Sequence, residues 1–176
     1  MLGRHLGNGA LLSLVLVSAS MYAYPASHVA KADSPKLAFY SSGKLFTVPI
    51  VLDASVVKKS APEKIEVIGE LKQVAIVLID TYASKPAGMS RCQAGEERFL
   101  RIFSLANKTP IETFRLKLES CRDNIELESP GIEWSPVSST LKINWLFGPT
   151  APGKPHSRIL IIGPDGRLRA REGRWK

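Results

Sequence analysis

Cys92 and Cys121 are the two residues with the clearest chemistry, and the sequence has no other cysteine. An isolated pair is normally oxidised when a chain is exported, as the N-terminus of this one predicts. Segments 99–105 and 111–118 are expected to pair as antiparallel strands. This pairing places Cys121 opposite Gly95, close enough to Cys92 for the roughly 6 Å between α-carbons that a disulfide requires. The Cys-x-x-Cys spacing of redox sites is absent, so we predict a structural disulfide.

Histidine is scarce, which limits the catalytic and metal sites that the sequence could form. If the leader is removed after Ala32, His156 is the one histidine left of the three. A zinc site would then have a single imidazole ligand, and we predict no metal site and no cofactor. A Ser-His-Asp triad would have to use His156, yet no Gly-x-Ser-x-Gly motif occurs. Lys154 and Arg158 beside it favour a solvated loop histidine.

Paired carboxylates need less scaffolding, since two suitably spaced acids can hydrolyse a glycosidic bond. Glu96 and Glu97 cannot form such a pair on a strand, because neighbouring side chains point to opposite faces. Asp80 ends an apolar segment, where burial could prepare a carboxyl group for acid catalysis. We expect it instead to accept hydrogen bonds from a turn at 81–84. No catalytic residue is therefore assigned.

A long loop at 83–95 is the first candidate for binding. It is tethered by Cys92 and is expected to expose Lys85, Met89 and Arg91. Recognition residues gather on loops that a rigid scaffold holds in place. The alternative is a plain connection between two strands.

The C-terminal hairpin is the second candidate. Arg167, Arg169 and Arg171 alternate with apolar residues, which places three guanidinium groups on one face of a strand. Arginine binds carboxylate or phosphate groups with two parallel hydrogen bonds. The same row of charges would also protect an edge strand from aggregation, and the two roles are compatible.

The net charge of +8 is concentrated near this hairpin. Residues 154–176 contain seven lysines and arginines against two acids, whereas residues 33–153 contain 15 against 14. The basic character therefore belongs to the C-terminal segment. A nucleic-acid partner is not expected, because the aromatic residues do not interleave with the arginines as stacking platforms would.

Apolar residues recur with the two-residue period of strands from Lys36 onward, as in 115–119 and 141–145. Segment 74–79 is apolar at every position, which is typical of a central strand covered on both faces. Segment 54–59 is expected to form at most a single helical turn. Turn residues predict hairpins at 41–43, 106–110 and 163–166. Further strands are expected at 44–52, 64–68, 99–105, 111–118, 124–128, 132–134 and 158–162. The sequence thus predicts an all-β fold, an antiparallel β-sandwich or a strongly bent meander of about ten strands.

The first residues have the features of a signal peptide. Arg4 and His5 form a short basic start before an apolar stretch at 10–19. This stretch is shorter than the roughly 20 residues of a spanning helix, so no transmembrane segment is expected in the mature chain. Cleavage is expected near Ser20 or Ala32. We therefore divide the chain into a signal peptide and short leader (1–32) and a single β domain (33–176) that ends in the arginine-rich hairpin.

These features predict an exported, periplasmic or secreted, non-catalytic binding module. Its expected partner is an unidentified protein or an anionic component of the envelope. In general architecture alone it resembles periplasmic inhibitor and immunity proteins, and no residue role is carried over. A carboxylate-dependent hydrolase of the cell envelope and a structural subunit of an envelope assembly are the alternatives.

Overall fold

A computed structural model describes residues 35–86, 92–107, 109–149, 155–166 and 168–173. These residues form ten strands and no helix, which confirms the predicted all-β class. Within these ranges there is accordingly no apolar helix of membrane-spanning length. The predicted signal peptide and leader lie outside the described residues. The strands are β1 (Lys36–Ser41), β2 (Lys44–Pro49), β3 (Lys64–Leu71), β4 (Ala75–Ala83), β5 (Glu96–Ser104), β6 (Ile111–Ser120), β7 (Glu126–Ser135), β8 (Thr140–Phe147), β9 (His156–Ile162) and β10 (Leu168–Gly173).

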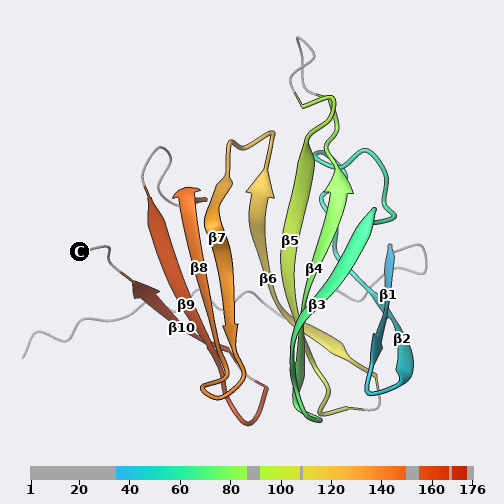
Figure 1. The fold of residues 1–176 in the computed structure, drawn as a ribbon. Coiled ribbons are helices and arrows are strands. Elements are labelled where there is room, and N and C mark those ends of the chain that lie inside the picture. The colour runs from blue at the N-terminus through green and yellow to red at the C-terminus, as the bar shows by residue number, and fades with distance from the viewer. Residues whose placement is uncertain (1–34, 87–91, 108, 150–154, 167, 174–176) are drawn as a thin grey trace, which may run out of the picture.

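The strands form three antiparallel sheets in which neighbours in space are also neighbours in sequence (Figure 1). β1 pairs with β2, and the two larger sheets have the orders β3-β4-β5-β6 and β10-β9-β8-β7. Residues 84–95 join β4 to β5 and residues 148–155 join β8 to β9, whereas two to six residues join the other paired strands. At the β1–β2 turn, Ser42 and Gly43 have positive φ angles of 47° and 75°, a geometry that matches the twist of a hairpin. The hairpins predicted at 41–43, 106–110 and 163–166 are confirmed.

One hydrophobic cluster, the inner core, takes its side chains from both four-stranded sheets. Leu141, Ile143 and Trp145 of β8 are fully buried in it, together with Val77 of β4. The Trp145 indole N–H donates a 2.8 Å hydrogen bond to the Leu118 carbonyl oxygen on β6, so its polar atom is satisfied. The alternation predicted for β8 places these apolar residues on its core-facing side.

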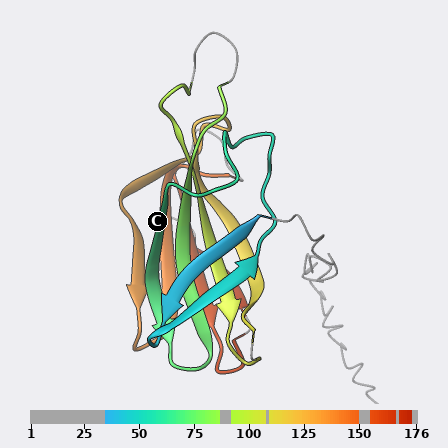
Figure 2. The same cartoon turned by 90° about the vertical axis from the view of Figure 1, so that its right-hand side faces the viewer.

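A second cluster, the outer core, lies between the β1–β2 hairpin and the opposite face of β4 and β5. Leu37 and Val48 of the hairpin pack there with Ile76 and Leu78 of β4. Figure 2 shows the hairpin crossing in front of this sheet. Because the intervening residues of β4 face the inner core, every residue of β4 before Ala83 is buried. The prediction of a strand covered on both faces is confirmed.

The two strands predicted at 124–128 and 132–134 correspond to one strand, β7, which begins at Glu126. The register of β7 against β8 shifts between Leu127 and Ile132, so the intervening Pro130 interrupts the pairing without ending the strand. Proline lacks the backbone N–H that a regular ladder of hydrogen bonds needs.

Beyond this irregularity, Trp134 of β7 lies against β3. The contact requires glycine at position 69, because a Cβ there would lie 2.6 Å from the Trp134 ring. The edges of the two four-stranded sheets are therefore in direct contact at this point.

The segment between β2 and β3 forms the single turn predicted at 54–59. The backbone N–H of Val57 donates to the Asp53 carbonyl oxygen at 3.4 Å. The Asp53 carboxylate accepts hydrogen bonds from the backbone and the hydroxyl of Ser55, which lower its pKa. The strand predicted at 44–52 is shorter than expected and ends at Pro49.

Candidate binding surface

Strand β10 forms an edge of its sheet, since β9 is its one neighbour in the described structure. Leu168 lies opposite Ile162 and packs against the inner core. The next residue, Arg169, is exposed. Arg171 is two residues further along β10, so Arg169 and Arg171 occupy equivalent register positions on this strand. Arg167 lies outside the described residues.

The sheet face beside these positions is partly apolar. Ile159 and Ile161 of β9 lie opposite Arg171 and Arg169, and both isoleucines are half-buried. Lys142 of β8 pairs with Ile159 from the other side of β9, and its side chain is exposed. This face thus combines cationic side chains with a short aliphatic strip.

The long loop lies at the other end of the molecule. Lys85 follows β4 and is exposed, and its backbone N–H donates to the Val56 carbonyl oxygen. Met89 and Arg91 lie outside the described residues. The β9–β10 turn instead packs beside Val74, which precedes β4. Because β4 spans nine residues, roughly 30 Å, the two predicted binding segments form separate surfaces.

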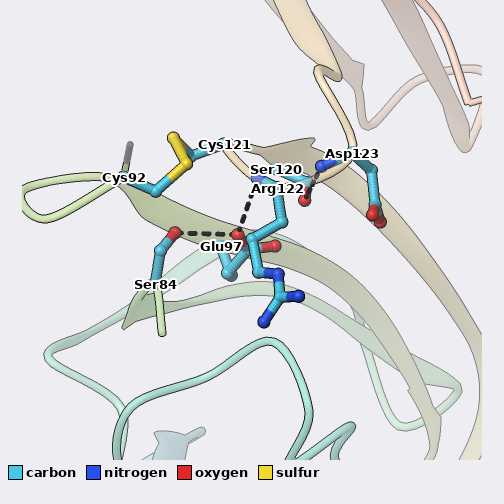
Figure 3. The surroundings of a disulfide bond; sticks show 7 residues. All are labelled: Ser84, Cys92, Glu97, Ser120, Cys121, Arg122 and Asp123. Atoms are coloured by element: carbon cyan, nitrogen blue, oxygen red, sulfur yellow. Dashed lines mark hydrogen bonds between the residues drawn. A yellow bond between two sulfur atoms is a disulfide. The ribbon is translucent and has the colours of Figure 1, made fainter. Parts of the chain in front are cut away.

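Cys92 and Cys121 form a disulfide with 5.6 Å between their α-carbons, as predicted (Figure 3). The expected register was wrong, because β5 and β6 contain two register shifts. Cys121 therefore does not lie opposite Gly95. Its backbone N–H donates to the carbonyl oxygen of the next residue, Glu96. Gly95 is nevertheless required, since a Cβ there would lie 2.6 Å from the Cys121 Cβ.

A buried carboxylate lies beside the disulfide, and the sequence did not reveal it. Glu97 is fully buried and accepts a 2.7 Å hydrogen bond from the Ser84 hydroxyl. The backbone N–H of Arg122 donates to the same oxygen at 3.4 Å (Figure 3). Glu96 is exposed, so the prediction that the two glutamates face opposite sides of the strand is confirmed.

Asp80 does not lie at a strand end, because β4 continues to Ala83 and no turn forms at 81–84. Its carboxylate accepts hydrogen bonds from the Nε of Arg101, at 2.8 and 2.9 Å, and from the Tyr82 hydroxyl at 2.6 Å. The side chains of Asp80 and Arg101 are 0% exposed. The β1–β2 hairpin packs on this face of the sheet, and the Val51 carbonyl oxygen, just after the hairpin, accepts a hydrogen bond from Arg101; the sequence did not predict this cover.

Arg101 connects Asp80 to a second acid, Glu112. Its Nη1 group donates to the two Glu112 carboxylate oxygens at 3.0 and 3.1 Å and to the Val51 carbonyl oxygen at 3.2 Å. Burial raises the pKa of Glu112, although the positive charge of Arg101 opposes this. Burial, with a smaller effect of Asp80, also raises the pKa of Tyr82. In the sequence, Arg101 is the one charged residue in the otherwise apolar segment 99–103, and this is the feature that pointed to the network.

His156 was expected in a solvated loop, but it begins β9 and is half-buried. Its ring stacks on the Trp145 indole, with 5.7 Å between centroids. The pairing of β8 with β9 places the two residues opposite each other. Among the described residues, no cluster of three or more histidines, cysteines or acids is arranged to hold a metal ion.

Three features could act on another molecule: the fully buried, ion-paired Asp80, the half-buried His156, and the β10 edge with the exposed Arg169. Of these, the edge is the feature that a partner can reach directly. No family model matches the chain, and neither the curated proteins nor the solved structures include one that is significantly similar to it.

Proposed function

We propose that this protein is an exported binding module, periplasmic or secreted, which engages a protein or an anionic envelope component and performs no catalysis. The N-terminal residues would direct export and then be removed. The C-terminal hairpin would bind the partner.

The position of Arg169 carries this proposal. An exposed arginine on an edge strand can reach a carboxylate or phosphate without moving any core residue. The open backbone of β10 can also pair with an added strand. Arg171, at the equivalent register position, and Arg167 would extend the same row of charge.

The alternative of a hydrolase that uses Asp80 has less support. This carboxylate is fully buried and held by Arg101 and Tyr82, so a substrate would have to displace the β1–β2 hairpin to reach it.

The test is affinity capture from the protein's own envelope extract with the immobilised mature chain, residues 33–176. Replacing Arg167, Arg169 and Arg171 with serine should leave the folded spectrum intact and strongly reduce the captured partner. Capture by the unmodified chain should also fall as salt is raised, because exposed charges are screened.

A matched control removes three exposed lysines that lie in β1 and in the segment between β2 and β3. Replacing Lys36, Lys58 and Lys59 with serine changes the net charge by the same amount and should not affect capture. If the arginine variant captures as much as the unmodified chain, the hairpin is not the binding surface.

A further inference from the structure

Three hairpin turns meet at the end of the molecule opposite the disulfide, at the lower end of Figure 1. They are the β3–β4 turn (72–74), the β7–β8 turn (136–139) and the β9–β10 turn (163–166). Gly166 has a φ of 71° and would place a Cβ 3.1 Å from the Val74 carbonyl oxygen. Glycine therefore permits both the turn geometry and the close packing of two turns that come from different sheets.

The turns line an open pocket of about 450 Å³. This volume is in the lower part of the roughly 300–1,000 Å³ range of small-molecule sites. Leu71, Ile161 and Pro164 supply apolar wall, and Ser138 and Ser139 supply polar groups at the β7–β8 turn. The pocket wall thus has an apolar part and a polar part.

The two charged residues that the described part of the chain places in the pocket wall are cations. Lys72 comes from the β3–β4 turn and Arg169 from β10, and no acid among the described side chains lines the pocket. Both side chains are exposed. In the described part of the chain, neither takes part in an ion pair. Their charges are therefore available to an anionic ligand.

We propose that this pocket binds a small molecule that joins a carboxylate to a short aliphatic group. Arg169 and Lys72 hold the carboxylate, since the guanidinium and the ammonium both line the pocket and both attract a negative charge. The aliphatic part covers Leu71, Ile161 and Pro164 and excludes water from them. The site shares Arg169 with the proposed partner surface, but Lys72 belongs to the pocket and Arg171 to the strand edge.

Hexanoate is a suitable probe, with the mature chain labelled for NMR. Its addition should shift backbone amide signals of the three turns and leave those near the disulfide unchanged. N-acetyl-alanyl-leucine carries the same chemistry on a peptide C-terminus, so comparing the two shows whether a free acid or a peptide end is preferred. Binding of either supports the proposal. No shift in the turns with both probes overturns it.

Two further probes test each half of the ligand. Acetate has the carboxylate without the chain, and 1-hexanol has the chain without the charge. Each should bind clearly more weakly than hexanoate. Equal affinity for either one would overturn the proposal, because it would show that one half of the site is not used.

Variants connect the binding to the named residues. Lys72→Gln and Arg169→Gln should each weaken hexanoate about two- to fivefold, the effect of one exposed ion pair. Lys59→Gln, on an exposed loop remote from the pocket, is the matched control and should have no effect. If Lys72→Gln and Arg169→Gln bind hexanoate like the unmodified chain, the pocket is not the site.

Arg171→Gln separates this site from the partner surface. Arg171 pairs with Ile159, two residues further from the β9–β10 turn than Arg169, so we expect this variant to bind hexanoate normally and to capture less partner. Lys72→Gln should do the opposite. Loss of partner capture in both variants with normal hexanoate binding would overturn the pocket and leave the proposed function standing.

Discussion

Replacing Arg101 with methionine would test the buried ion pair of the outer core. Methionine keeps much of the side-chain volume but removes the charge and every hydrogen bond that Arg101 makes. The Asp80 carboxylate would then retain the 2.6 Å hydrogen bond from Tyr82 but lose both contacts to the guanidinium. A buried carboxylate without its cation is strongly unfavourable, because neither water nor an opposite charge compensates it.

The expected loss follows from the burial of both partners. Their side chains are 0% exposed, so solvent screening does not weaken the pair. Removing one member of such a pair lowers the free energy of unfolding by about 3–5 kcal/mol. For a domain of this size, that corresponds to a decrease of about 6–20 °C in Tm. It would also remove a large share of a typical total of about 5–15 kcal/mol.

Urea unfolding at pH 7, followed by tryptophan fluorescence, would measure this loss. Arg98→Met is the matched control, because Arg98 lies on the same strand and pairs with Glu119 where both side chains are about a quarter exposed. It should lose less than about 1 kcal/mol. The double variant Asp80→Asn/Arg101→Met should recover at least about 1 kcal/mol of the Arg101→Met loss, since no unpaired charge remains.

A specific result would refute this reasoning. If Arg101→Met lost no more free energy of unfolding than Arg98→Met, the buried pair would not stabilise the outer core. If the double variant recovered nothing, the loss would come from packing around Arg101 instead of from the unpaired Asp80.

Two further predictions concern pH and the disulfide. Because burial raises the folded-state pKa of Glu112 above 4.5, its contribution to stability is fully present below that pH and is lost as pH rises through the folded-state pKa. The free energy of unfolding of the unmodified chain minus that of Glu112→Gln, measured by urea unfolding, should therefore fall as pH increases from about 4 to 7; a constant or rising difference would contradict this. Cys92→Ser and Cys121→Ser should each lower the free energy of unfolding by about 3–4 kcal/mol, because the bond closes a loop with a sequence separation of 29. Clearly unequal losses in the same assay would assign the two cysteines separate roles.

The local features of the fold could be predicted from the sequence. The two-residue polarity period and the turn residues located the strands and three hairpins, because both depend on neighbouring residues in the chain. The unbroken apolar run of β4 correctly indicated cover on both faces. The disulfide followed from the number of cysteines and the predicted pairing of two adjacent strands.

The candidate sites depended on contacts between distant segments. The β5–β6 register could not be predicted because its two shifts leave no mark in the polarity period. The prediction that Asp80 ends a strand was wrong, because β4 continues to Ala83. Its partner Arg101 comes from β5 and reaches it through the pairing of β4 with β5. Neither residue type nor spacing showed that a separate hairpin covers both.

The sequence by itself determined the class of the fold, its hairpins and its disulfide, because backbone geometry, turn chemistry and thiol chemistry act over short stretches of chain. Only the tertiary structure decided which charges are buried in pairs and which remain exposed. It also separated Lys85 from Arg169 and placed Arg169 and Lys72 in the wall of one pocket. The reason is that burial and proximity depend on how the sheets pack, which is a property of the whole chain.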